Sequence, residues 1–117
     1  MELTFDEKKG IKVVGFIGRL DGNNAKEVQE ELLSNIELND KSEIILNMPG
    51  CEYISSAGLR LLMILAKNLK MKGGIGVLSG MIEEVRDVME MTGFSNIFKN
   101  FIDVETAIDY IQSEREV

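Results

Sequence analysis

The sequence predicts a single α/β domain, built on a mixed sheet of four to five strands with about four helices. Short apolar runs of strand type alternate with longer segments whose apolar residues recur every three or four positions, the pattern of an α/β sheet with parallel pairing. The chain has 117 residues, close to the commonest domain size, and no linker, repeat or low-complexity tract divides it. We therefore expect residues 1–117 to form one domain around one modest core.

The first half of the sequence is expected to hold three strands and one helix. Leu3–Phe5 and Ile11–Ile17 have strand composition, and the basic, glycine-containing turn between them predicts a hairpin. The first helix is expected to begin near Asn24, because Asn24 and Glu27 have the spacing of a capping box. Its apolar series is Ala25, Val28, Leu32 and Ile36. Glu43–Asn47 is a short apolar run, typical of a buried central strand.

The second half is expected to hold three helices and two further strands. A helix that starts around Ser55 or Ser56 should end at Gly73–Gly74, since glycine is favoured just after a helix. The apolar face of this helix consists of Leu59, Leu62, Met63, Ala66 and Leu69. The remaining elements are two strands and two helices. A strand is expected at Ile75–Leu78, and a helix at Met81–Met91 with Ile82, Val85, Val88 and Met89 inward and Gly93 closing it. A short strand at Ile97–Phe101 and a helix capped by Asp103 follow.

The charge balance argues against a nucleic-acid partner, because the net charge is −7 and affinity for phosphate backbones comes from clustered lysine and arginine. Lys67, Lys70 and Lys72 lie close together, but cations near a helix C-terminus complement its dipole, so we interpret them as a solvated helix end. The apolar stretches are too short to cross a bilayer, and the N-terminus lacks the pattern of a signal peptide. We expect a cytoplasmic protein without membrane insertion.

The residue inventory also argues against catalysis. The sequence has no histidine, which excludes Ser-His-Asp and Cys-His chemistry and histidine-containing zinc sites. Cys51 is the single cysteine and has no thiol neighbour with which to bind a metal. The run Gly73–Gly76 lacks the G-K-[ST] ending of a phosphate-binding loop. We predict no catalytic residue, no bound cofactor and no metal site, and hence not an enzyme.

Seven methionines raise the question of a plastic binding surface. Several of them fall at inward helical positions, which favours core filling. Met81 and Met91 are the two that we single out for exposure.

The segment Tyr53–Arg60, with the sequence Y-I-S-S-A-G-L-R, holds two adjacent serines at an expected helix start. One serine is explained as an N-cap, which is favoured over alanine by about 1 kcal/mol. A cap explains neither the second serine nor Gly58 in the first turn, where glycine costs roughly 0.5–1 kcal/mol. Small residues here would let another protein's active site approach a hydroxyl, and a phosphate would meet the positive end of the helix dipole. From the residues alone, a cap and a phosphorylation switch both remain open.

The chain resembles the STAS domains, specifically the stand-alone anti-sigma factor antagonists of bacteria. The segment Tyr53–Arg60 matches the signature of that family, and the resemblance runs almost from end to end. The other matching segments are Gly18–Asp21, Ile44–Asn47, Val77–Gly80, Val85–Val88, Thr92–Phe94 and Ile97–Phe98. The resemblance implies a STAS-like fold for residues 1–117.

The resemblance also implies a partner-switching function. In that family the unphosphorylated antagonist binds an anti-sigma factor that is a serine kinase, which frees the sigma factor. The kinase phosphorylates the antagonist with its own ATP, and a PP2C-type phosphatase removes the phosphate. The phosphoacceptor lies two residues before the signature glycine, which is Ser56 here. Ser55 is the second candidate, and it stands where many relatives carry aspartate.

The partner-binding residues implied by the resemblance surround this acceptor. They are Asp21, Gly22, Asn23 and Asn24 in the family's other contact loop, and Ala57, Gly58, Leu59 and Arg60 at the helix start. The residues alone favour Asp21 as a turn or capping residue, and the resemblance brings that role level with partner contact. Arg60 is equally a solvated residue or a clamp for an acidic group. Asn47 stands where aspartate is common in the family, although asparagine also occurs there. The loop Met48–Cys51 is unusual for the family and is expected to bear on partner specificity. Neither departure removes the acceptor.

The main alternative is a binding-only STAS scaffold or regulatory module that is not phosphorylated. Both functions leave the same marks in the sequence, and phosphorylation of Ser56 by a cognate kinase would separate them. A monomer is the default expectation for such a domain.

Overall fold

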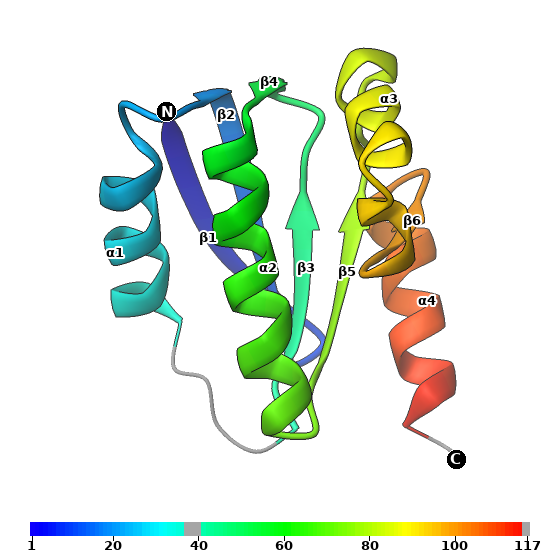
Figure 1. Ribbon diagram of the computed structural model, residues 1–117. Coiled ribbons are helices and arrows are strands. Elements are labelled where there is room, and N and C mark those ends of the chain that lie inside the picture. The colour runs from blue at the N-terminus through cyan, green and yellow to red at the C-terminus, as the bar shows by residue number, and fades with distance from the viewer. Residues whose placement is uncertain (37–40, 116–117) are drawn as a thin grey trace.

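Strands and helices alternate along the chain in the computed structural model, which describes residues 1–36 and 41–115. The strands are β1 (Glu2–Lys8), β2 (Ile11–Leu20), β3 (Glu43–Asn47), β4 (Cys51–Ile54), β5 (Ile75–Ser79) and β6 (Lys99–Phe101). The helices are α1 (Ala25–Asn35), α2 (Ser56–Met71), α3 (Glu83–Met91) and α4 (Val104–Glu114), with a 3₁₀ turn η1 at Phe94–Asn96. The predicted α/β class, the helix count and the mixed sheet are confirmed (Figure 1).

The sheet has the strand order β1-β2-β3-β5-β6. β1 and β2 form the predicted antiparallel hairpin, and each later neighbour on this path pairs in parallel. The predicted central strand β3 lies in the middle, and its residues Ile44, Ile45 and Leu46 are fully buried. A strand buried on both faces reads as a continuous apolar run, which is why this one could be recognised without alternation.

The strand β4 was not predicted, because the chain at Met48–Cys51 was interpreted as a loop. β4 pairs in parallel with the end of β2, beyond the reach of β3, and the pairing shifts register between Gly18 and Arg19. Gly18 has a φ of +110°, a conformation that side chains with a Cβ rarely adopt. The glycine in β2 therefore marks the irregularity at which this strand changes partner from β3 to β4.

Helices cover both faces of the sheet. α1, α2 and α3 enclose the larger cluster of apolar side chains, which includes Val14, Phe16, Ile44 and Leu46 of the sheet. α4 covers the other face, where Ala107, Ile108 and Ile111 pack against Ile11, Val13, Ile45 and Val77. Alternate residues of β2 and β3 thus point into opposite layers, as the period of two requires.

The helix boundaries follow the predicted signals except at the start of α3. Asp103 caps α4 by accepting a hydrogen bond from the Thr106 N–H at 2.8 Å, and Gly73 and Gly93 follow α2 and α3 with left-handed backbone. α3 begins at Glu83, two residues later than predicted. The inward face of α2 was also partly wrong. Leu61 and Leu65 are buried there, whereas Met63 is 40% exposed.

Core filling explains only part of the methionine content. Met48 and Met89 are fully buried, but Met63, Met71 and Met91 are exposed. Of the two residues singled out from the sequence, Met91 is 86% exposed and Met81 is half-buried. No helix within residues 1–36 and 41–115 has the length and apolarity needed to cross a membrane.

Candidate functional site

The two adjacent serines at the start of α2 have different environments. Ser55 is the N-cap, half-buried, and its Oγ accepts a hydrogen bond from the Gly58 N–H at 3.2 Å. Ser56 is the first residue of the helix and is exposed. Its hydroxyl has no hydrogen-bond partner among the described residues. The cap and the second serine therefore have separate roles, and the accessible hydroxyl belongs to Ser56.

The start of α2 is tied to the end of β2. Leu20 pairs with Ile54, and the backbone N–H of Ser55 donates to the Leu20 carbonyl at 2.9 Å. The loop that begins at Asp21 therefore leaves the sheet immediately beside the serines, at the same end of the molecule (Figure 1). The two predicted contact segments, which are more than 30 positions apart in the sequence, adjoin in the structure.

A network of hydrogen bonds fixes the shape of the Asp21 loop. The Asp21 carboxylate accepts from the backbone N–H groups of Asn23 at 2.9 Å and of Asn24 at 3.2 Å. The Asn24 amide oxygen accepts from the Asp21 N–H at 3.0 Å, and its NH₂ group donates to the Arg19 carbonyl at 2.8 Å. Asp21 is thus a turn-forming residue in this structure, and its loop presents Gly22 and Asn23 as exposed residues.

The predicted capping box at Asn24 and Glu27 is wrong. Asn24 is the N-cap of α1 by position, but its side chain makes no capping hydrogen bond to the helix. The amide is engaged with Asp21 and Arg19 instead, so it organises the loop that precedes the helix. Side chains of this type compete for nearby backbone groups, and here the upstream partners are favoured.

Gly58 serves close packing and does not provide an open approach for a partner. A Cβ atom at this position would lie 2.8 Å from Leu20 Cγ and 2.9 Å from Ile54 Cγ1. Gly58 and Leu59 are buried, so the expectation that they contact a partner does not fit this structure. They allow α2 to start directly on the ends of β2 and β4. Ala57 is half-buried, and Arg60 is exposed on the outer face of the helix.

The structure adds three residues that sequence reasoning missed. The Arg19 guanidinium lies 4.2 Å from the centroid of the Tyr53 ring, in a cation–π contact across the β2–β4 pair. Tyr53 is 40% exposed, and Ile17, on the same strand as Arg19, is 45% exposed. Recognition of β4 as a strand would have indicated this pairing. Arg19, Tyr53 and Ile17 therefore give β2 and β4, the strands that lead to the Asp21 loop and to Ser56, a partly apolar surface with one cation.

The two departures from the family pattern lie at the carboxyl ends of the parallel strands. The Asn47 Oδ1 accepts a hydrogen bond from the Ser79 hydroxyl at 3.0 Å, which links β3 and β5. Cys51 is fully buried, its thiol lies 3.5 Å from the Tyr53 carbonyl, and burial raises its pKa. The Cys51 thiol is therefore not a reactive group at the surface. No cluster suited to a metal ion occurs among the residues that the structure describes.

Comparison with known proteins agrees with this architecture. Residues 2–107 match the family model of the STAS domain. The chain is 34% identical over 98 residues to BtrV of Bordetella bronchiseptica, which is provisionally named an anti-sigma factor antagonist, and the match covers 84% of each chain.

Two solved structures show the same fold. One comes from Thermotoga maritima and is provisionally described as an anti-sigma factor antagonist, with a TM-score of 0.85, 19% identity and 94% coverage of each chain. The other is the anti-sigma factor antagonist SpoIIAA in its unphosphorylated form, with a TM-score of 0.75, 18% identity, and coverage of 96% of this chain and 97% of that one. The protein belongs to the STAS domain family, and BtrV, its curated relative at 34% identity, is named for the anti-sigma factor antagonists.

Proposed function

We propose that this protein is an anti-sigma factor antagonist, a partner-binding switch set by phosphorylation of Ser56. In its unphosphorylated form it binds an anti-sigma factor that is also a serine kinase. Phosphorylation of Ser56 releases that partner, and a PP2C-type phosphatase restores binding. The protein acts as a cytoplasmic monomer and is not itself an enzyme, since the kinase supplies the ATP.

The observation that carries this proposal is the exposed and unbonded hydroxyl of Ser56 beside the Asp21 loop. A kinase can reach this oxygen without breaking a hydrogen bond of the folded protein. Ser55, by contrast, would have to give up its hydrogen bond to Gly58 N–H. The names of BtrV and SpoIIAA as anti-sigma factor antagonists support the anti-sigma factor as the class of partner.

The chemistry of the switch is a phosphoryl transfer. The Ser56 hydroxyl oxygen attacks the γ-phosphorus of the ATP held by the kinase, the bond to the β-phosphate oxygen breaks, and the hydroxyl proton passes to a base of the kinase. ADP leaves. The phosphatase reverses the mark by hydrolysis with water, which releases inorganic phosphate and regenerates the hydroxyl.

A phosphate on Ser56 is compatible with the fold but unfavourable for binding of the partner. At the first position of α2, a phosphate lies by the positive end of the helix dipole, which favours negative charge. The same group adds up to two negative charges to the proposed partner surface, which includes Ser56 and the exposed residues of the Asp21 loop. A partner that covers this surface must then desolvate the phosphate, so binding weakens while the fold persists.

The test is phosphorylation by the cognate anti-sigma factor kinase with labelled ATP, followed by measurement of binding. Wild type should accept one phosphate and lose affinity for the kinase. Ser56→Ala should accept none and bind constitutively, and Ser56→Asp should mimic the mark only partly, because a carboxylate has less charge and fewer oxygens.

Ser55→Ala is the matched control at the neighbouring hydroxyl. It should still accept phosphate at Ser56, although loss of the cap lowers the stability by about 1 kcal/mol. Full phosphorylation of Ser56→Ala would transfer the acceptor assignment to Ser55. Stable binding of the kinase with no phosphorylation of either serine would leave a binding-only STAS module.

A further inference from the structure

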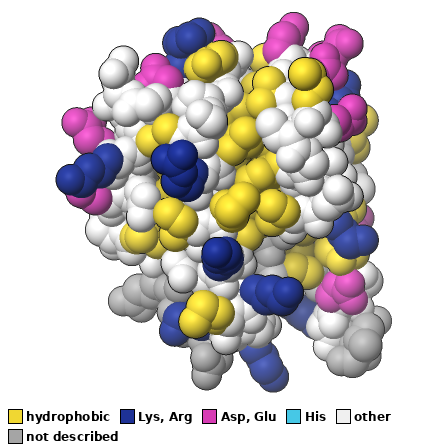
Figure 2. Space-filling view, in the orientation of Figure 1, with side chains coloured by type: hydrophobic (Ala, Val, Ile, Leu, Met, Phe, Trp, Pro, Cys, Tyr) yellow, Lys and Arg dark blue, Asp and Glu magenta, His cyan; other side chains and the backbone are white. Residues whose placement is uncertain are grey.

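A groove on the flank of α2 lies apart from the serine site. It has a volume of about 650 Å³ and runs between α2, the start of β5 and the η1–β6 segment. Its apolar walls are formed chiefly by Met63, Ala66, Ile97 and Phe98. Figure 2 shows the corresponding band of hydrophobic side chains beside α2, with lysine or arginine side chains along its margin. Small-molecule sites typically have about 300–1,000 Å³, so the groove has the size of a ligand site.

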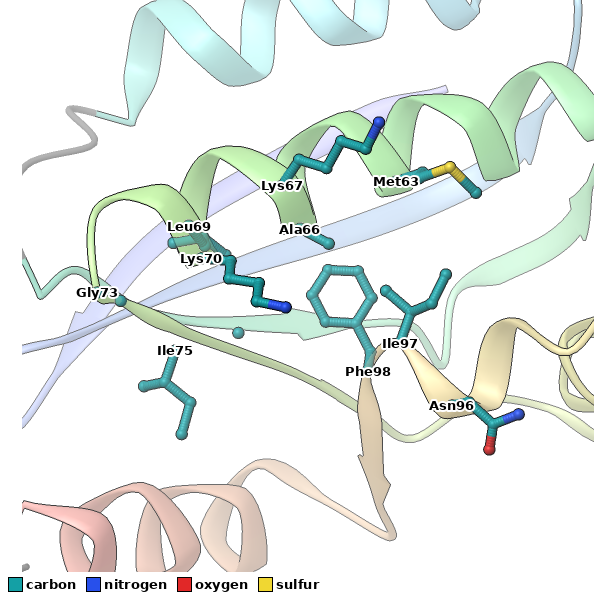
Figure 3. Close-up of a pocket in the computed structure, with 12 residues that line it drawn as sticks. Met63, Ala66, Lys67, Leu69, Lys70, Gly73, Ile75, Asn96, Ile97 and Phe98 are labelled. Atoms are coloured by element: carbon teal, nitrogen blue, oxygen red, sulfur yellow. The ribbon is translucent and has the colours of Figure 1, made fainter.

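Leu69 and Phe98 form the floor of the groove over Gly76, the second residue of β5. A Cβ at Gly76 would lie 2.7 Å from Leu69 Cδ1 and 2.9 Å from Phe98 Cε1. The backbone of β5 thus comes directly beneath these two side chains. Ile75 points to the other side of the sheet, where it packs with the α4 layer (Figure 3). Side chains of α2 and of the η1–β6 segment occupy the space over the strand.

The charge at the groove is opposite to that of the whole molecule. The chain has a net charge of −7, yet the charged residues among the described lining are Lys67 and Lys70. Lys70 extends across the mouth of the groove toward the Phe98 ring, whereas the Lys67 ammonium group points away from the floor (Figure 3). The interpretation of these lysines as a solvated helix end is therefore incomplete, because Lys70 covers an apolar cavity.

The apolar rim is left exposed to solvent. Met63 is 40% exposed and Ile97 is 42% exposed, and the two side chains flank the same end of the groove (Figure 3). The lining on α2 extends from Met63 to Lys70, about 10 Å along the helix axis. This length suits a small molecule. A docked protein would need an interface of roughly 800 Å² on this chain, much more than a groove of two helical turns offers.

We propose that this groove binds a small anionic amphiphile, namely a monomeric medium-chain carboxylate or a compound of the same chemistry. The apolar body lies against Met63, Ile97 and Phe98, and the anionic head is paired with the Lys70 ammonium group at the mouth. The site is separate from Ser56 and the Asp21 loop, so its occupancy provides an input that the phosphorylation switch does not require.

The test is titration of the ¹⁵N-labelled protein with decanoate below its micelle-forming concentration, with displacement of the fluorescent anion 8-anilinonaphthalene-1-sulfonate as a second readout. We expect saturable binding of one decanoate, with amide shifts concentrated at the second half of α2, Gly74–Gly76 and Asn96–Phe98. Decanol, which has the same chain without the charge, should bind more weakly.

Two exposed residues give variants with matched controls elsewhere on the surface. Lys70→Gln should weaken decanoate binding about two- to fivefold, the range of a surface ion pair. Ile97→Ser should weaken it about fivefold through the loss of apolar contact. Lys72→Gln and Ile102→Ser change the same residue types outside the groove and should leave the affinity within about twofold.

Three results would overturn the proposal. The first is the absence of saturable decanoate binding. The second is binding that Lys70→Gln and Ile97→Ser affect no more than their controls. The third is retention of the protein on phosphatidylglycerol vesicles without binding of monomeric decanoate, which would assign the surface to a membrane instead.

Discussion

Ser55 and Ser56 are adjacent in sequence but differ in what their hydroxyl groups do. The Ser55 hydroxyl is committed to the first turn of α2 through Gly58 N–H, whereas that of Ser56 faces solvent. The two serines therefore differ in role: Ser55 caps the helix, and Ser56 offers an accessible hydroxyl, which one serine could not do while capping. Phosphorylation of Ser55 would place the phosphate on the oxygen that caps the helix, whereas phosphorylation of Ser56 leaves that oxygen unchanged.

At the same scale, Gly58→Ala should destabilise the protein even though alanine is the better helix former. The added methyl group would meet Leu20 and Ile54 below 3.0 Å, and overpacking of this kind costs about 1–3 kcal/mol. The helix propensity returns at most about 1 kcal/mol. Urea denaturation of wild type and variant measures the difference. Gly22→Ala, which adds a methyl into open space, is the control. Unchanged or increased stability of Gly58→Ala would contradict the packing role.

Ser56→Asp should not destabilise the fold. A carboxylate at the first position of α2 interacts favourably with the helix dipole, by about 0.3–1 kcal/mol at low salt. Thermal unfolding at low ionic strength should show an equal or slightly higher melting temperature than wild type, and Ser56→Lys should show a lower one. A marked loss of stability in Ser56→Asp would mean that weakened partner binding reflects misfolding.

At the scale of single elements, the start of α1 depends on the Asp21 loop and not on a capping box. Asn24→Ala removes the hydrogen bonds to the Asp21 N–H and the Arg19 carbonyl, and should lower the free energy of unfolding by about 1–2 kcal/mol. Glu27→Ala should change it by less than about 0.5 kcal/mol. Chemical denaturation of both variants measures the two changes in the free energy of unfolding. A larger loss in Glu27→Ala than in Asn24→Ala would support the capping box instead.

The contribution of the Asp103 cap of α4 to the stability of the fold depends on pH. The hydrogen bond from the Thr106 N–H holds the pKa of Asp103 below its ordinary value of 3.8. A carboxyl group with a lowered folded-state pKa stabilises the fold above the unfolded value and loses this effect as the pH falls through the folded value. Wild type should therefore melt above Asp103→Asn at pH 7, and the gap should close below pH 3.8. A gap that persists in acid would contradict this assignment.

Local signals in the sequence identified the elements whose character, start or end is marked by neighbouring residues. The hairpin turn, the apolar run of β3, the glycines after α2 and α3, and the Asp103 cap all depend on neighbouring residues, and each was predicted. β4 was not predicted because its four residues show too little alternation of apolar and polar side chains to indicate a strand, and because it pairs with the distant end of β2. The cation–π pair of Arg19 and Tyr53 could not be predicted for the same reason.

The candidate site was predicted in part for a similar reason. The family signature indicated Ser56, and the structure shows that its hydroxyl is exposed, but burial removes Gly58 and Leu59 from the accessible surface. Their burial depends on Leu20 and Ile54 beneath them, which is tertiary information. Likewise, Met63 fits the apolar period of α2 but faces the groove, because the wall opposite it is supplied by the η1–β6 segment.

At the scale of the whole molecule, the length of α2 separates the proposed phosphorylation site from the proposed ligand groove. The serines and the Asp21 loop lie at the end of the fold where β2, β4 and α2 meet (Figure 1), whereas the groove lies farther along α2, toward its C-terminal end. A molecule with a net charge of −7 gains up to two further negative charges on phosphorylation. Because these charges are added at one end of the molecule, they act directly on the proposed partner interface there, and no change in the core is needed.

Phosphorylation of Ser56 can be measured by intact-mass spectrometry, with peptide mapping, of the protein purified from its native host. We expect a fraction of the molecules to carry one phosphate, located at Ser56 and absent from Ser55. A population that stays unmodified, even after exposure to every serine kinase of that host, would contradict the switch.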